Sequence, residues 1–190
     1  KKSLPYIKFK GKSSLSENNK EITYKVDGNT PEIESLKFIA SDNEASLPSG
    51  DFEQMTSSVI LGGIKKRYVK FSLSAFDTNG IDTKTGSVQA NIGGKPVTFT
   101  HKETVGQKSV FESEIVSFEG SNFVSGDYNF IISVKDTSGL LGTKTYSFKV
   151  DNDSPEIKVM TPKPKDDSPF HSEVLVYGDV SISGTAMDSY

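Results

Sequence analysis

Hydrophobic and polar side chains alternate along most of this chain with a period of two residues, the pattern of a β-strand with one buried face. The pattern predicts strands over residues 7–10, 21–26, 31–38, 69–79, 87–92, 97–100, 111–116, 128–134 and 144–150. No segment carries a sustained apolar period of 3.6 residues, so we expect little helix. Between residues 31 and 150, about seven strands follow one another at the spacing of an all-β sandwich.

The predicted core consists of inward-facing residues of these alternating strands. We expect it to contain, either themselves or through their strand neighbours, Val26, Phe71, Leu73, Ile131, Phe148 and Val150. Gly93 and Gly94 stand between two predicted strands and indicate a tight hairpin, because a two-residue turn of this kind favours glycine.

One stretch of the chain occurs twice. Residues 148–157 read FKVDNDSPEI and residues 24–33 read YKVDGNTPEI, an offset of 124 positions. A repeat at a fixed offset indicates a modular array. Proline has no N–H group and keeps the residue before it extended, so we interpret this stretch as a stiff junction between two units.

A second match relates residues 69–79 to residues 180–190, at the smaller offset of 111 positions. The central unit therefore has 13 more residues between its first two strands, within an insertion at about residues 45–67. Insertions usually map to surface loops, where function often lies.

The two repeats predict three units. Residues 1–30 are the C-terminal hairpin of a preceding unit, residues 31–151 are a complete domain with the insertion, and residues 152–190 are the first strands of a following unit. The chain starts at Lys1 without an initiator methionine, so we expect it to be a segment of a longer protein.

Three motifs carry a family resemblance. They are the Val-Asp-Asn-x-Ser/Thr-Pro-Glu-Ile junction, the Ser-x-Thr/Ser-Ala-x-Asp second strand, and Gly-Asp-Tyr-Asn-Phe at residues 126–130. Together they resemble tandem bacterial immunoglobulin-like repeats of the fibronectin III and cadherin-like kind. The third motif resembles the tyrosine corner of such domains, in which the hydroxyl of a tyrosine placed like Tyr128 bonds to nearby backbone.

The resemblance implies an all-β, immunoglobulin-like antiparallel sandwich of about seven strands in a tandem array. It also implies an extracellular or cell-surface protein in which the modules form a stalk, a spacer or an adhesive surface. The neighbouring repeats of the same chain are then its first partners. An architecture of this kind hosts many unrelated roles, so the fold alone does not give the function.

Composition excludes several classes of protein. The formal net charge of −3 gives no clustered basic surface for nucleic acid. No apolar run reaches the roughly 18 residues of a membrane helix, so we expect no direct membrane insertion. There are no cysteines, which excludes disulfides and thiolate metal sites. There is no tryptophan to stack on a sugar ring, which argues against a carbohydrate-binding module.

No catalytic motif is present. His101 and His171 are far apart in the sequence, and neither lies near a nucleophile, metalloprotease or phosphate-loop pattern. We therefore predict that the chain is not an enzyme and needs no cofactor, with Ca²⁺ as the one ion to consider.

The calcium hypothesis rests on the second junction, which resembles the Asp-x-Asn-Asp-Asn-x-Pro linker of cadherins. Asp151 and Asp153 would supply carboxylate oxygens, the ligands that Ca²⁺ prefers. Asp136 and Asp188 would lie near the same boundary. The alternative is that Asp and Asn end the strand and shape a turn before proline. We favour the turn, because the earlier copy of the junction holds fewer acidic residues.

The insertion supports a second hypothesis, a surface for a protein, extracellular-matrix or other surface ligand. Its apolar residues would form the contact, since exposed apolar patches mark interaction sites. They are Phe52, Met55, Val59, Ile60 and Leu61. The alternative, which we favour, is an extra edge strand or a loop tucked against the sandwich, with the basic residues 65–67 in solvent.

The sequence thus predicts a non-catalytic structural or adhesive module of a bacterial surface or secreted protein. Two other functions stay open at this point. One is an accessory spacer domain of a larger secreted enzyme, and the other is a module whose cadherin-like junctions are stiffened by Ca²⁺.

Overall fold

The structure is a computed structural model that describes the chain except for residues 1–5, 11–20, 162–178, 180, 182, 189 and 190. The strands are β1 (Tyr6–Lys10), β2 (Glu21–Lys25), β3 (Glu32–Ser41), β4 (Glu53–Gln54), β5 (Ile60–Leu61), β6 (Tyr68–Phe76), β7 (Val88–Ile92), β8 (Lys95–Pro96), β9 (Phe99–Val105), β10 (Lys108–Ser113), β11 (Val116–Ser117), β12 (Gly126–Lys135), β13 (Leu141–Val150), β14 (Glu156–Thr161) and β15 (Ser183–Met187). Within the described residues the one helical element is a 3₁₀ turn, η1 (Glu44–Ser46). No helix in this part of the chain is long and apolar enough to span a membrane.

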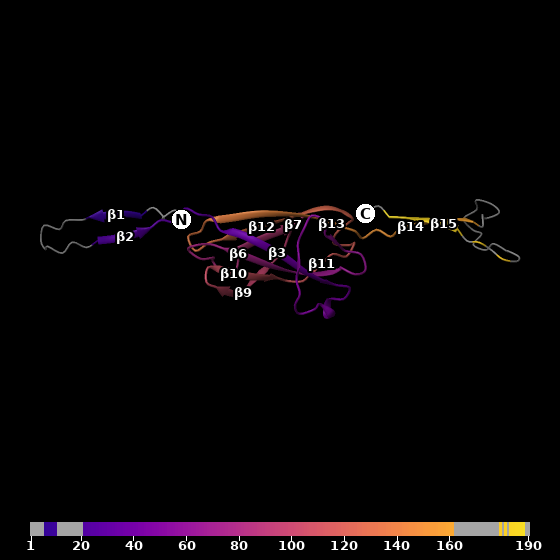
Figure 1. Ribbon diagram of the computed structural model, residues 1–190, viewed down its shortest axis with the longest axis horizontal. Helices are drawn as coiled ribbons and strands as arrows, with labels where there is room; N and C mark the ends of the chain where they lie inside the picture. The colour runs from indigo at the N-terminus through magenta and orange to yellow at the C-terminus, as the bar shows by residue number, and fades with distance from the viewer. Residues whose placement is uncertain (1–5, 11–20, 162–178, 180, 182, 189–190) are drawn as a thin grey trace.

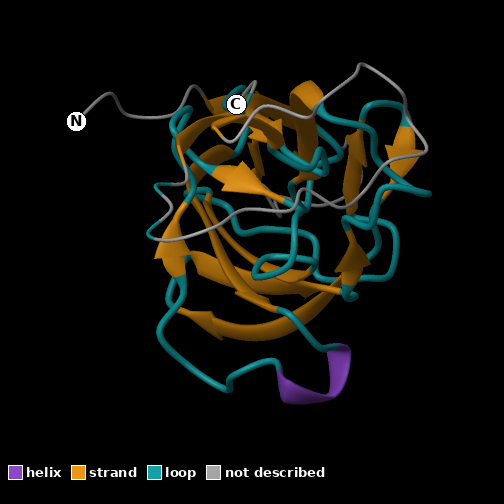
Figure 2. Ribbon diagram, turned by 90° about the vertical axis from the view of Figure 1, so that its right-hand side faces the viewer, coloured by secondary structure: helices purple, strands orange, loops and turns teal. Residues whose placement is uncertain are grey.

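Strands β3 to β13 form two sheets that pack face to face, so the central unit is a β-sandwich (Figure 2). One sheet has the order β4-β3-β6-β10-β9, with β11 also paired to β6, and the other has the order β5-β13-β12-β7-β8. Seven of these eleven strands have five or more residues, and the other four have two each. The prediction of an all-β fold is confirmed.

The core is aromatic. Phe71 of β6 meets Phe130 of β12 edge to face, with ring centroids 4.8 Å apart, and this contact joins the two sheets. Phe118 stacks on Phe123 at 4.6 Å and meets Phe148 at 5.8 Å. Such aromatic pairs add to the free energy gained from burial alone.

The predicted core is correct for four of its six residues. Val26 and Ile131 are 41% and 40% exposed. On β12 the inward positions are Phe130, Ile132 and Val134, so Ile131 faces solvent because successive strand residues point to opposite faces. Val26 precedes β3 and lies outside both sheets of the sandwich.

The hairpin predicted around the two glycines is confirmed. Gly93 and Gly94 have φ values of 56° and 84°, as a type I′ turn between β7 and β8 requires. The second strand of this hairpin is β8, which lies in the predicted turn region and before the strand predicted over residues 97–100. Phe99 already belongs to β9, on the other sheet, so the chain crosses between layers at residues 97 and 98.

Tyr128 forms the predicted corner. Its hydroxyl donates to the carbonyl oxygen of Val124, four residues upstream, at 3.1 Å. Its ring packs against Phe123 and Phe148, so one side chain ties the loop before β12 to the core.

Two hairpins extend from the sandwich at its opposite ends, β1 with β2 at one and β14 with β15 at the other (Figure 1). The second hairpin repeats the register of the sandwich's first two long strands. Glu32 pairs with Phe76 in β3 and β6, and Glu156 pairs with Met187 in β14 and β15. These pairs are separated by the same offsets that relate the repeated sequences.

The start of β3 lies directly against β13. A Cβ atom at Gly142 would lie 1.8 Å from the carbonyl oxygen of Pro31, and both residues are buried. Lys144 of β13 also donates to the carbonyl oxygen of Ile33 at 3.0 Å. Only glycine therefore allows the chain to enter the sandwich at this place.

We expect Gly142→Ala to lower the free energy of unfolding by about 3 kcal/mol, because backbone must move to admit the methyl group. Urea denaturation measures this. Gly28→Ala is the matched control, since a Cβ there meets nothing within 4 Å. Equal stability of G142A and wild type would contradict the close packing of Pro31 on β13.

A carboxylate between two lysines stabilises the first sheet. Glu112 of β10 lies 2.6 Å from the Nζ of Lys70 and 3.5 Å from that of Lys102, its diagonal neighbours on β6 and β9. The hydrogen bond from Lys70 holds the pKa of Glu112 below its usual value, although burial acts in the opposite direction.

A lowered folded-state pKa stabilises the protein above the unfolded pKa of about 4.3, and that contribution is lost as pH falls through the folded value. We therefore expect the free energy of unfolding of wild type to exceed that of Glu112→Gln by less than about 1 kcal/mol near pH 6. This difference should vanish in stronger acid. Urea denaturation at several pH values tests this. Glu103→Gln, on an exposed position of β9, is the control, and a pH-independent difference for E112Q would refute the assignment.

Candidate metal centre at the N-terminal junction

Three carboxylates meet where the chain enters the sandwich. Asp27 belongs to the N-terminal junction, which we define as residues 26–31, whereas Asp77 follows β6 and Asp136 follows β12. Each offers one oxygen, and these oxygens all lie within 4.8 Å of one another. We call these three residues the carboxylate cluster.

Each aspartate is held by a turn that begins with it. Oδ1 of Asp77 accepts from the amide of Asn79 at 2.7 Å, and Oδ1 of Asp27 accepts from the amide of Asn29 at 3.2 Å. Oδ1 of Asp136 accepts from the amides of residues 138 and 140, both at 2.8 Å, and from the Ser138 hydroxyl at 2.7 Å. These bonds fix the direction of each carboxylate.

Two of the other oxygens of the cluster are not satisfied. Oδ2 of Asp27 and Oδ2 of Asp136 are buried and have no hydrogen-bond partner. Asp77 and Asp136 are only 3% and 1% exposed. No ion pair to the cluster exists among the described residues. A buried carboxylate oxygen that has no hydrogen-bond partner costs free energy, even where the other oxygen of the same group is bonded.

Mutual repulsion adds to that cost. Two unit charges at this separation repel by roughly 3 kcal/mol at an effective dielectric constant of 20. A bound cation removes the repulsion and satisfies the free oxygens together. The geometry of the cluster is therefore compatible with a bound cation.

The donor set selects the kind of cation. All three groups are carboxylates, and hard oxygen donors favour Ca²⁺ or Mg²⁺ over zinc or copper. Ligands at about 2.4 Å from one Ca²⁺ lie no more than about 4.8 Å apart, as these oxygens do. The side-chain oxygen and nitrogen of Asn79, two residues after Asp77, are also buried and have no hydrogen-bond partner.

The predicted metal residues are divided between two ends of the sandwich. Asp136 belongs to the cluster, but Asp151 and Asp153 follow the far end of β13. The ten residues of β13 span about 33 Å, so these groups cannot share an ion with Asp136. Asp188 directly follows β15 and lies at that far junction too. The grouping of the four predicted residues into one site is wrong.

Asp27 and Asp77 were not among the predicted metal residues, although the repeat points to them. Asp27 is the repeat counterpart of Asp151, and Asp77 is the counterpart of Asp188. Replacing Asp151 and Asp188 by these counterparts in the preceding repeat gives the cluster, together with Asp136.

The turn interpretation of the junctions is correct. Oδ1 of Asp151 accepts from the amide of Asp153 at 3.2 Å, which repeats the bond between Asp27 and Asn29. A turn and a metal ligand are compatible, because the turn uses one oxygen of each carboxylate and leaves the other.

The insertion does not expose the apolar surface proposed for it. Met55 and Leu61 are 3% and 1% exposed and belong to the core, and Val59 packs against it. Strand β4 extends the first sheet beside β3, and β5 pairs in parallel with β13 of the second sheet. The insertion is thus the extra edge strand of the alternative prediction. Of the five residues only Ile60 is exposed, at 41%, whereas Phe52 and Val59 are half-buried.

The structure describes one of the two histidines. His101 is exposed on β9, where its Nε2 lies 2.8 Å from the Thr104 hydroxyl. His171 lies outside the described residues.

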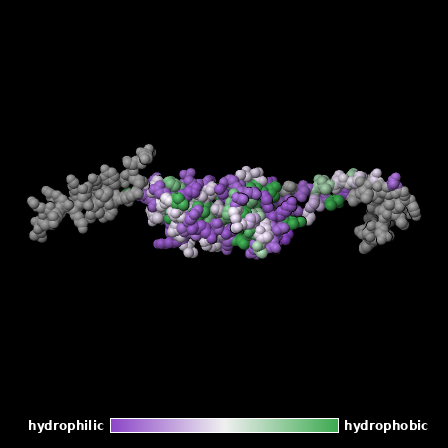
Figure 3. Space-filling model, turned by 60° about the horizontal axis from the view of Figure 1, so that its bottom comes forward, coloured by the Kyte–Doolittle hydropathy of each residue, from purple (hydrophilic) through white to green (hydrophobic). Residues whose placement is uncertain are grey.

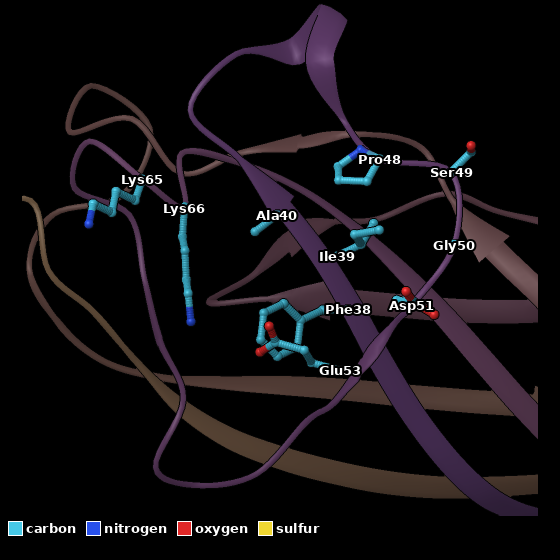
Figure 4. Close-up of a pocket in the computed structure, with 10 residues that line it drawn as sticks. All are labelled: Phe38, Ile39, Ala40, Pro48, Ser49, Gly50, Asp51, Glu53, Lys65 and Lys66. Carbon is cyan, nitrogen blue, oxygen red and sulfur yellow. The ribbon is translucent and has the colours of Figure 1, made fainter.

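A pocket of 420 Å³ lies between β3 and the insertion (Figure 4). Strand β3 contributes Phe38, Ile39 and Ala40 to its lining. The insertion contributes residues 48–51 and Glu53 on one side and Lys65 and Lys66 on the other. The Nζ of Lys66 lies 5.4 Å from the centre of the Phe38 ring. Across the face of the sandwich seen in Figure 3, hydrophilic and hydrophobic residues are interspersed. Neither feature selects a ligand.

Comparison with known proteins assigns this chain to no family. No protein-family model matches the chain, and no curated protein matches it. A similar solved structure is that of CopC from Methylosinus trichosporium OB3b, with 17% identity and a TM-score of 0.31 over 51% of this chain and 84% of that one. At that TM-score the likeness carries no argument about this chain.

Proposed function

We propose that residues 31–151 are a non-catalytic, immunoglobulin-like module of a tandem array, and that its N-terminal junction binds Ca²⁺. The module acts as a stalk or spacer in a secreted or cell-surface protein, with its surface free to contact a ligand. The carboxylate cluster is the observation that carries the proposal.

The cluster joins the junction that follows β2 to the two sheets of the sandwich. Asp27 belongs to the junction, whereas Asp77 and Asp136 are anchored at the ends of the central strands of the two sheets. A cation held by all three fixes the preceding hairpin relative to the sandwich. Binding would therefore set the reach and stiffness of the array.

The tandem arrangement is supported by the shared register of β3 with β6 and of β14 with β15. The tyrosine corner and the sheet pairing support the immunoglobulin-like assignment. Extracellular modules bind Ca²⁺ with dissociation constants of about 10⁻⁴–10⁻³ M, which suits a site of three carboxylates on a secreted protein.

The test is the thermal unfolding midpoint of the 190-residue chain with EDTA and with 10 mM CaCl₂. For a dissociation constant of about 10⁻⁴ M, mass action adds about 2.7 kcal/mol. We expect the midpoint to rise by about 5–10 °C. Titration calorimetry should give one ion per chain.

Asp136→Asn should abolish the calcium shift but leave the midpoint in EDTA equal to or above that of wild type. The amide keeps an acceptor for the turn amides of Ser138 and Leu140 and removes one of three like charges. Asp127→Asn, an exposed position at the far end of β12, is the matched control and should keep the full shift. A wild-type midpoint unchanged by CaCl₂ would exclude the proposed ion.

A further inference from the structure

Asn152, the second residue after β13, forms hydrogen bonds to the sandwich through its backbone amide and both polar groups of its side chain. Its amide donates to the Ser125 hydroxyl at 2.9 Å, and its Nδ2 donates to the carbonyl oxygens of Phe118 at 2.9 Å and Phe123 at 2.6 Å. Its Oδ1 accepts from the amide of Gly63 at 2.9 Å. All of its donor groups are used, and the partners come from two separate loops.

The insertion supplies one side of this arrangement. Its strand β5 runs beside the end of β13, where the amide of Lys149 donates to Val59 at 3.0 Å and the amide of Asp151 donates to Leu61 at 2.9 Å. The chain therefore stays paired to the sandwich for one residue beyond β13.

Gly62 allows the turn after β5 to approach the junction. Its φ is 88°, and a Cβ there would lie 2.7 Å from Oδ1 of Asn152 and 2.9 Å from the carbonyl oxygen of Asp151. Glycine meets both requirements, because it tolerates positive φ and has no side chain.

The N-terminal junction lacks this arrangement. The repeat counterpart of Asn152 is Gly28, which has no side chain to bond, and a Cβ there would meet nothing within 4 Å. The two junctions therefore differ at this position, although both form the same turn after the strand. The matched part of the following unit is 13 residues shorter where the insertion would stand.

We propose that the insertion and Asn152 form a clamp that fixes the direction in which the chain leaves the sandwich, without any metal. We define the clamp as residues 59–63 with Asn152 and its partners Phe118, Phe123 and Ser125. It makes residues 150–152 part of the rigid module and moves the hinge of the C-terminal junction to residues 153–155.

In this proposal the insertion has a structural role that does not require a ligand. Every bond of Asn152 joins neutral groups, so the clamp responds neither to chelators nor to moderate changes in pH. The module is then held by an ion where the chain enters and by amide hydrogen bonds where it leaves. This inference stands independently of the proposed calcium site.

Amide hydrogen exchange of the 190-residue chain, followed by NMR in EDTA, tests the clamp. In wild type the amides of Gly63, Asp151 and Asn152 should be protected. In Asn152→Gly, exchange at Gly63 and Asp151 should speed up at least tenfold, with the β12 amides of the core unchanged. Asp153→Gly is the matched control, because it adds the same backbone freedom one residue later and removes no clamp bond.

Gly62→Ala disturbs the clamp at the insertion, where the added methyl group would collide with Asn152 and Asp151. It should speed up amide exchange at Asp151 in the same way. Unprotected amides at Gly63 and Asn152 in wild type would overturn the proposal. So would protection in N152G equal to that of wild type, or protection in wild type that requires CaCl₂. Failure of calcium to bind would leave all of these expectations unchanged.

Discussion

The contact between Phe71 and Phe130 is the one on which the rest of the sandwich depends. These rings lie on β6 and β12, the central strands of the two sheets, and meet edge to face 4.8 Å apart. Every other strand is placed by backbone pairing to one of these two or to a neighbour of theirs. The contact therefore fixes the register of one sheet over the other.

The register of the two sheets determines where the carboxylate cluster forms. Strands β6 and β12 end at the same end of the sandwich, so Asp77 and Asp136, each the next residue after its strand, come together there. The start of β3, seated against Gly142, then brings Asp27 to the same place. The cluster is thus a consequence of where hydrophobic strands stop. The polar ends of the module are determined by its apolar centre.

Much of the fold can be predicted from the sequence, because a period of two and paired glycines are local signals. The strands, the Gly93 turn and the corner at Tyr128 follow from a few adjacent residues. The side of each strand that is buried is harder to predict. The error at Ile131 arises because residues 130–132 are all apolar, so both faces of the strand look alike and only packing decides between them.

The candidate site was less predictable, for a different physical reason. Its three aspartates are separated by 50 and 59 positions, and only the pairing of strands brings them together. The prediction joined residues from opposite ends of a strand of about 33 Å. The burial of Met55 and Leu61 agrees with the favoured interpretation of the insertion as an edge strand, although a strand this short leaves almost no periodic signal.

The positions of the two junctions have a mechanical consequence. The chain enters beside β3 and leaves from β13 at the opposite end, so tension applied to the two junctions acts parallel to these strands. Strand β3 holds nine residue pairs with β6, and antiparallel hydrogen bonds lie perpendicular to the strands. A pulling force must therefore shear these bonds together instead of opening them one at a time. In this geometry the resistance to extension depends on the number of bonds loaded at once, and therefore on the length of the β3–β6 pairing.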